Sequence, residues 1–290
     1  MTYSLQKIIK TALFIVMSFN KKKIVKAMLD YSPPPAFNIE CKSPNFDSWN
    51  DVSVESKELL SQNPNAFFIG GLFDRQVNAG KAWEIPYNLK TRLGHLNINK
   101  ISKMGVKELA IHIGPNKHGK ALHRFHNQMA DCLIFACILL IDKYEGSAEN
   151  IWKGNQNIQF VLSNLIEFKG ISQKIANMLV RLLITYYGVR LKGWSELDVA
   201  VDRHVARVFL RTGLIDSEQE KKIYKISNVK KSVILSAREL SPKFPGALDE
   251  PAFEIGKYWC TAEKAYCNYE GDPCPLNIVC TKDKIDYSIS

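Results

Sequence analysis

The sequence predicts an all-helical protein. Apolar residues recur at helical spacing along most of the 290-residue chain, and the alternation that marks half-buried strands is scarce. Hydrophobic residues make up 46% of the chain, which is enough for one large or two small domains with apolar cores. No internal repeat or low-complexity segment interrupts this pattern.

The first 50 residues are expected to form an extension that is helical and then irregular. Apolar spacing predicts one or two helices over residues 5–29, closed by Pro33, while 33–52 is typical of a linker. The apolar run 11–19 is too short to cross a bilayer, and basic residues follow it where a signal peptide would have a cleavage site. We therefore expect a cytoplasmic protein with no membrane segment.

Further helix signals follow in order from Asn63, which can cap a helix whose first position suits Pro64. Apolar residues continue this helix to Phe73. The next spacings predict helices over 81–93, 98–104, 123–144, 158–168, 174–187 and 205–211. Pro86 lies inside the first of these, so that helix is expected to be kinked or to start later.

A tight turn joins the helices predicted over 158–168 and 174–187. Gly170 can take a positive φ angle, and Ile171 is placed to fill the space between the two helices. The second helix would present backbone N–H groups and its positive dipole end outward, where a DNA phosphate fits. A plain helical hairpin inside a core is the alternative, and the sequence of residues 170–176 favours a DNA-binding hairpin.

The net charge of +10 and the pI of about 9.1 favour an anionic partner. Charge alone does not separate nucleic acid from an acidic membrane surface.

Four cysteines lie close together near the C-terminus, with six, six and five residues between them: Cys260, Cys267, Cys274 and Cys280. In a reducing compartment such an array favours a metal or iron–sulfur site over disulfides. Zinc sites usually bring cysteines two to four residues apart, whereas a [4Fe–4S] cluster accepts wider spacing. Cys132 and Cys137 lie in an apolar helical run and are interpreted as small core residues.

Three segments together resemble the endonuclease III-like helix–hairpin–helix DNA glycosylases, the HhH-GPD superfamily. Residues 168–177 resemble the family's hairpin, Leu-Pro-Gly-Val-Gly-Arg-Lys-Thr-Ala-Asn, and residues 201–205 resemble its Val-Asp-Thr-His segment. The cysteine array follows, as the family's iron–sulfur loop does. The resemblance runs from about residue 63 to residue 280 and implies two helical domains, an active-site cleft between them and a C-terminal [4Fe–4S] loop.

The chain departs from the family in three places. Ser172 replaces the second hairpin glycine, which is tolerated if its φ angle stays negative. The family's cysteine spacing is six, two and five, so the extra residues here lie within 268–273. The segment 187–197 is also longer than usual. By the resemblance, one domain spans 64–203 with its hairpin at 158–187, and the other combines 51–63 with 204–290, including the loop 260–280.

The resemblance implies that Lys174 is the lyase nucleophile and Asp202 its catalytic partner. Lys174 has a plainer interpretation as a lysine that contacts phosphate or solvent. Asp202 precedes a predicted helix and can act as its N-cap, a role compatible with catalysis. Asp198 is a rival carboxylate, and His204 is interpreted as a hydrogen-bonding support.

Contacts with DNA are expected from Gln76, Gly170 and Ser172. Gln76 resembles the family's intercalating Gln, with a solvated residue at a helix end as the alternative. We expect a monomeric DNA glycosylase with AP-lyase activity, acting on a base flipped out of double-stranded DNA, and nucleoid-associated in a bacterium or archaeon. The alternatives are a monofunctional enzyme that uses Asp-activated water, a non-catalytic DNA-binding protein, and an RNA substrate.

Overall fold

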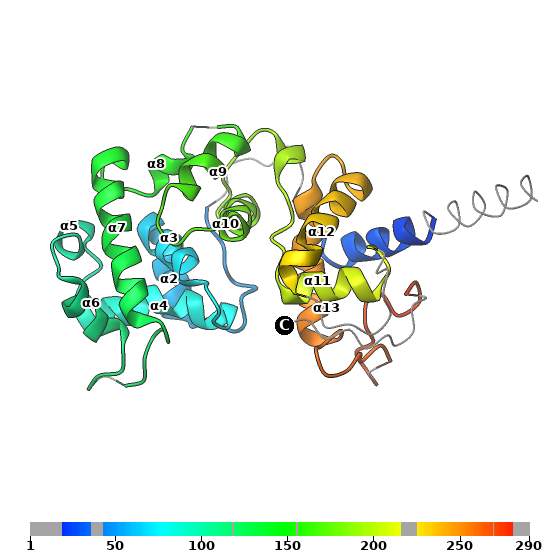
Figure 1. The fold of residues 1–290 in the computed structure, drawn as a ribbon, viewed down its shortest axis with the longest axis horizontal. Helices are drawn as coiled ribbons and strands as arrows, with labels where there is room; N and C mark the ends of the chain where they lie inside the picture. The colour runs from blue at the N-terminus through cyan, green and yellow to red at the C-terminus, as the bar shows by residue number, and fades with distance from the viewer. Residues whose placement is uncertain are drawn as a thin grey trace, which may run out of the picture. The chain divides into compact units, whose positions relative to one another are not determined.

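The computed structural model describes residues 19–35, 43–117, 119–154, 156–215, 225–268 and 270–280. Over these residues its regular elements are helices, and none is a strand, which confirms the all-helical prediction. The chain divides into two compact units, one formed by 35–193 and the other by 1–34 together with 194–290 (Figure 1).

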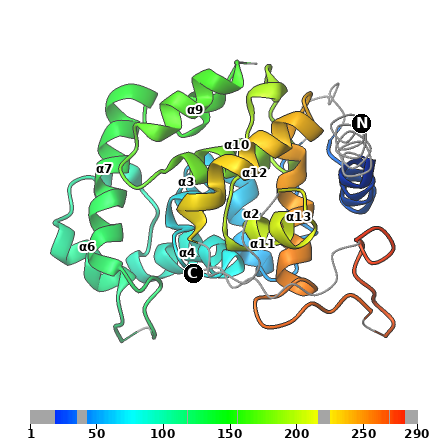
Figure 2. The ribbon, with the colours of Figure 1, turned by 45° about the vertical axis from the view of Figure 1, so that its right-hand side comes forward.

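The helices of the 35–193 unit follow one another along the chain, and the longest connection described lies between α6 and α7 (Figure 2). They are α2 (Val54–Gln62), α3 (Pro64–Phe73), α4 (Ala79–Leu93), α5 (Ile98–Ile101), α6 (Val106–Ile113), α7 (His126–Tyr144), α8 (Glu149–Trp152), α9 (Ile158–Ile166) and α10 (Gln173–Thr185).

The described helices of the other unit are fewer. They are the helix over 19–31, the 3-10 turns η1 (Trp194–Glu196) and η2 (Pro245–Leu248), and the helices α11 (Arg203–Arg211), α12 (Ile226–Leu240) and α13 (Asp249–Tyr258).

The predicted helix starts are explained by their caps. Asn63 accepts hydrogen bonds from the amides of Asn65 and Ala66, and Pro64 occupies the first position of α3, as expected. α4 contains Pro86 and ends at Gly94, whose φ is 75°. α7 begins at His126 rather than at His123, because the side chain of His123 accepts the amide of Phe125 and caps a loop there.

Helix α3 runs through the core of the 35–193 unit. Every residue from Ala66 to Phe73 is buried, so the helix has no solvent-facing side. Gly70 and Gly71 make this possible. A Cβ atom on Gly70 would lie 2.4 Å from the ring of Trp83, and one on Gly71 would lie 2.3 Å from Cδ2 of Leu179. The two glycines therefore let α4 and α10 approach the backbone of α3.

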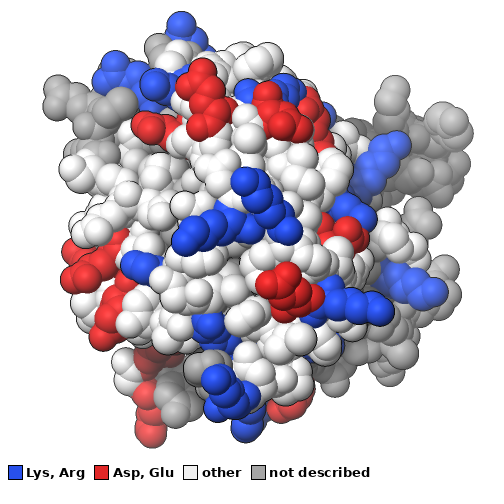
Figure 3. Space-filling model, turned by 90° about the vertical axis from the view of Figure 1, so that its left-hand side faces the viewer, with Lys and Arg blue, Asp and Glu red and all other residues white. Residues whose placement is uncertain are grey.

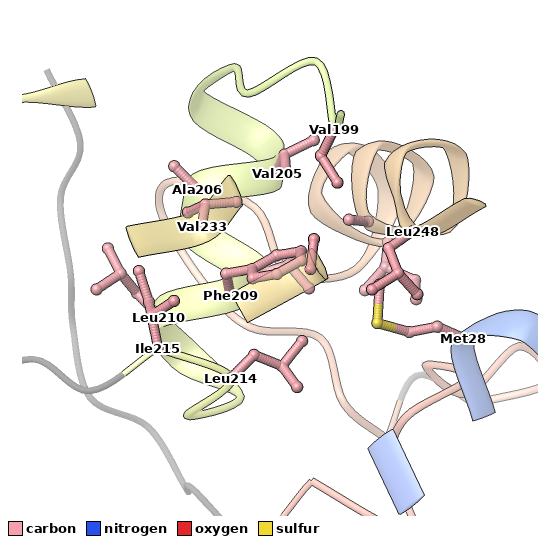
Figure 4. Close-up of a cluster of buried hydrophobic side chains, with 14 of the residues drawn as sticks. Met28, Val199, Val205, Ala206, Phe209, Leu210, Leu214, Ile215, Val233 and Leu248 are labelled. Carbon is pink, nitrogen blue, oxygen red and sulfur yellow. The ribbon is translucent and has the colours of Figure 1, made fainter. Parts of the chain in front are cut away.

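The other unit has a separate apolar core built around α11. Val205 and Phe209 of this helix pack among residues of α12 and α13, and Met28 of the N-terminal helix lies in the same cluster (Figure 4). The expected division of the chain differs from this arrangement at several places. Residues 194–203 belong to this unit rather than to the domain expected over 64–203, and residues 35–50 belong to the 35–193 unit rather than to an N-terminal extension. The helix over 19–31 is part of this core rather than an extension, and α2 belongs to the 35–193 unit, where it packs against α3 and α4.

Substitution of Gly71 by Ala is expected to destabilise the protein by about 1–3 kcal/mol, because the new methyl group overlaps the buried Leu179 side chain. Chemical denaturation measures the change. Leu179→Ala makes room for that methyl group, so the double variant should lose less stability than the sum of the two single variants. A strictly additive double variant would contradict the close packing of α3 on α10.

Candidate active site

The turn between α9 and α10 has the geometry expected of a helix–hairpin–helix. Gly170 has a φ of 98°, and a Cβ atom there would lie 3.0 Å from the Cys132 sulfur and 3.3 Å from Nη1 of Arg75. Both the backbone angle and the available space therefore require glycine. Ile171 is buried, as the sequence predicts for a residue that fills the gap between the two helices.

Ser172 forms the N-cap of α10 with a φ of −86°, so the position does not require glycine. Its hydroxyl oxygen accepts the amide of Ile175 at 3.4 Å. One amide at the start of α10 is thus satisfied within the chain, which leaves fewer amides for an outside anion than a glycine at this position would.

Lys174 is the second residue of α10, and its side chain is 28% exposed. Its ammonium nitrogen lies 3.4 Å from Oδ2 of Asp74, whose side chain is only 9% exposed. Asp74 directly follows α3, and no sequence pattern identifies it as a site residue. One hundred residues separate the two partners, so only the folded chain reveals the contact.

Gln76 lies in the loop after α3, with an exposed side chain and a φ of 55°. The left-handed region is unusual for a residue other than glycine, and strained residues of this kind occur at helix ends and at functional sites. The guanidinium of Arg124 donates a hydrogen bond to Oε1 of Gln76 and lies 4.6 Å from the ring centre of Phe125. The Gln76 side chain is therefore held by a neighbouring loop.

A buried histidine fixes the backbone of the same loop. Nδ1 of His123 accepts the amide of Phe125 at 3.0 Å, so the ring hydrogen is on Nε2, which donates to the carbonyl of Arg75 at 3.0 Å. Burial lowers the pKa of His123, and the positive charges of Arg124 and Arg75 lower it further. The neutral ring thus connects the segment before α7 to residues 74–76.

In the other unit, Asp202 is the N-cap of α11, as one interpretation of the sequence predicts. Its Oδ1 accepts the amides of His204 and Val205 at 2.8 and 2.9 Å. The cap holds the carboxylate rigidly at the positive end of the helix. Gly256 of α13 packs directly on this turn, since a Cβ atom there would lie 2.7 Å from the carbonyl oxygen of His204.

His204 supports this turn. Its Nδ1 lies 3.0 Å from Nη2 of Arg207, which can only donate, so Nδ1 accepts. Burial lowers the pKa of His204, although the charge of Asp202 opposes that change. The rival carboxylate, Asp198, is 8% exposed and forms two hydrogen bonds with Arg238 of α12, at 2.7 and 2.9 Å. Asp198 therefore fastens η1 and its flanking loop to α12.

The cysteine loop packs on the core of its own unit. Arg207 donates to the carbonyl of Cys260 at 2.6 Å, and Arg211 donates to that of Thr261 at 2.6 Å and approaches the Cys260 sulfur at 3.5 Å. Burial raises the pKa of Cys274 to about 12, with contributions from three neighbouring thiols: Cys260, Cys267 and Cys280. The three other cysteines of the array therefore act electrostatically on Cys274.

Three further findings concern metal sites, membrane helices and surface charge among the described residues. No group of three or more His, Cys, Asp or Glu side chains among them is placed to hold a single metal ion. None of their helices has both the length and the apolarity to cross a membrane. Figure 3 shows basic and acidic side chains interspersed on one face of the molecule, so the net positive charge does not make that face uniformly basic.

The protein should lose stability as the pH falls below 6.5, the unperturbed value for histidine, because the buried His123 and the partly buried His204 both have lowered pKa values. The unfolded chain binds protons there and the folded chain resists them. His123→Gln removes one of these groups, so its stability should fall less steeply over the same range. His95→Gln, at a partly exposed histidine, should keep the parent's steeper fall. Equal slopes in all three proteins, measured by denaturant unfolding against pH, would contradict this account.

Comparisons with known proteins agree on the fold. No family model and no curated protein matches the chain. Among solved structures, a trapped endonuclease III–DNA covalent intermediate aligns with a TM-score of 0.56 and 19% identity, covering 90% of this chain and 96% of that one. A non-covalent endonuclease III–DNA complex gives 0.56 and 20%, covering 90% and 95%. A thermostable thymine-DNA glycosylase gives 0.55 and 16%, covering 91% and 97%. The chain therefore has the all-helical, endonuclease III-like fold of the helix–hairpin–helix DNA glycosylases.

Proposed function

We propose that this protein is a DNA glycosylase with AP-lyase activity, in which Lys174 is the nucleophile. The observation that carries the proposal is the hairpin itself. A left-handed Gly170 turns the chain into α10, and a half-buried lysine occupies the first turn of that helix. The fold is that of an endonuclease III trapped covalently on DNA, which supports the same chemistry here.

The proposed reaction begins when the neutral amine of Lys174 attacks C1′ of the damaged nucleotide. A C–N bond to the enzyme forms as the glycosidic bond breaks, and the base leaves with the bonding electrons and takes up a proton. Ring opening gives a Schiff base. Loss of a 2′ proton then expels the 3′ phosphate by β-elimination, and water releases the lysine.

Asp202 is proposed to stabilise the positive charge that develops on the sugar as the glycosidic bond breaks. Its cap contacts suit this role, because both amide hydrogen bonds go to Oδ1 and hold the carboxylate in one orientation. A carboxylate fixed in advance does not have to reorganise during the reaction. In a monofunctional enzyme the same group would orient water instead.

The base must leave the stack before the sugar is accessible. We propose that Gln76 fills the gap, since its exposed side chain follows a buried helix in a backbone conformation held by His123. Insertion would require the Gln76 side chain to exchange its contact with Arg124 for the duplex. We also propose that the protein is cytoplasmic, associated with the nucleoid if it is bacterial or archaeal, and that it acts as a monomer.

We further propose that the four C-terminal cysteines hold a [4Fe–4S] cluster. The proposal rests on the chemistry of the donor set: four cysteine sulfur atoms within residues 260–280, with the Arg211 guanidinium beside that of Cys260. When bound, the cluster would cross-link the loop 260–280. Arg207 and Arg211 anchor the start of that loop to α11.

Borohydride should trap the parent protein on a duplex that contains an abasic site, and Lys174→Ala should abolish trapping because the amine is gone. Lys169→Ala is the matched control, since Lys169 lies in the same hairpin but is exposed and paired with Asp131. Asp202→Asn should slow base release by about a hundredfold or more while leaving DNA binding intact.

Gel electrophoresis of the trapped complex, together with a panel of lesion-containing duplexes, separates the alternatives. Base release without a trapped complex would show that the protein is a monofunctional glycosylase and not a lyase. Neither product on any lesion, with Asp202→Asn binding DNA as the parent does, would leave only a DNA-binding protein.

Protein purified without oxygen should be yellow-brown, with the broad visible absorption of an iron–sulfur cluster. Cys274→Ser should lose this absorption because it removes a buried sulfur ligand, while Cys137→Ser, in the buried interior of α7, should retain it. A colourless protein with stoichiometric zinc would overturn the cluster assignment and leave the hairpin proposal intact.

A further inference from the structure

Two charged residues in the 35–193 unit lie at helix ends that disfavour their charge. Asp74 follows the last residue of α3, where the helix dipole is negative, and Lys174 is in the first turn of α10, where it is positive. Each placement costs stability by itself. The two side chains meet at 3.4 Å, so each offsets the unfavourable position of the other.

The close packing of α3 on α10 brings the two groups together. Gly71 has no side chain, which lets Leu179 contact the backbone of α3. Asp74 is three residues further along, so it leaves α3 on the same side as Gly71. The carboxylate thus faces the start of α10, and its 9% exposure keeps the contact largely out of water, where electrostatic interactions are strong.

Two other charged groups near the hairpin have partners of their own. Lys169 is exposed and pairs with Asp131 of α7 at 2.5 Å. Arg75 lies beside Gly170 and within 4.0 Å of the Cys132 sulfur, and burial raises the pKa of that thiol. Asp74 is the carboxylate that lies 3.4 Å from the Lys174 nitrogen.

We propose that Asp74 is a positioning residue that anchors the amine of Lys174 and holds it as an ammonium ion until substrate binds. This role rests on the proposed function. Asp74 then sets the pH at which the Schiff base forms. The dipole of α10 favours the neutral, nucleophilic amine, and the carboxylate opposes it. The balance between them is local to the hairpin and the end of α3.

The test is the rate of borohydride trapping on an abasic-site duplex, measured against pH with the full-length protein. In Asp74→Asn the midpoint should move by about one pH unit toward acid, because the carboxylate no longer favours the ammonium form. On the acid side the rate, relative to its plateau, should rise about tenfold. Asp74→Glu keeps the charge and should keep a midpoint near that of the parent.

Glu167→Gln is the matched control. It removes a carboxylate of equal charge from the same unit, where Glu167 pairs with Lys143 at 2.6 Å. Its midpoint should equal that of the parent. If the parent is trapped but Asp74→Asn keeps the parent's midpoint, or moves it to higher pH, the role of Asp74 is refuted. If the parent is never trapped, the proposed lyase function fails instead.

A second measurement does not depend on activity. Reductive methylation with ¹³C formaldehyde labels the lysine amines, and the resonance of Lys174 is the one missing from Lys174→Arg. This resonance should titrate at higher pH in the parent protein than in Asp74→Asn, because the helix dipole is the same in both. Titration at the same pH in both, or at lower pH in the parent, would show that Asp74 does not hold the ammonium form.

Discussion

The 35–193 unit depends on burying α3 on every side. A helix without a solvent-facing side is in contact with other parts of the protein around its whole circumference. Large side chains on every face would keep those parts away from the helix backbone. Gly70 and Gly71 resolve this conflict by letting Trp83 and Leu179 contact the helix backbone. The position of α10, and therefore of the hairpin that begins it, follows from this contact.

The loop that follows α3 is positioned by the same helix. Asp74, Arg75 and Gln76 are consecutive, yet each is held by a different part of the unit: the start of α10, the ring of His123 and the guanidinium of Arg124. The left-handed backbone at Gln76 is maintained by these contacts. A short segment thus joins the proposed nucleophile to the residue proposed to enter the duplex.

In the second unit α11 has a comparable connecting role. Its N-terminus holds Asp202, and its buried arginines, Arg207 and Arg211, hold the start of the cysteine loop. Buried guanidinium groups are costly unless they form hydrogen bonds, and here backbone carbonyls of α13 and the loop accept hydrogen bonds from Nε and Nη2 of Arg207 and from Nη1 of Arg211. Helix capping and catalysis are compatible at Asp202, because a cap needs one carboxylate oxygen and electrostatic stabilisation needs a fixed charge.

The sequence by itself determined what depends on local rules. Helical periodicity, the Asn63 cap and the glycine of the hairpin predict the all-helical class and most helices of the 35–193 unit, since propensities and caps act over a few residues. The helices α2, α6, α8, α12 and α13 were not predicted. The N-terminal helix shows the limit of such rules: its apolar face was visible, but the core that receives Met28 was not.

Only the tertiary structure determined which charged side chains pair with one another. Asp74 and Lys174 are one hundred residues apart, and Asp198 and Arg238 are forty apart. No local pattern distinguishes a carboxylate that binds an arginine of a neighbouring helix from one that caps its own helix. That choice depends on how closely helices approach, which is set by side-chain volume over the whole core and not by the residues around the charge.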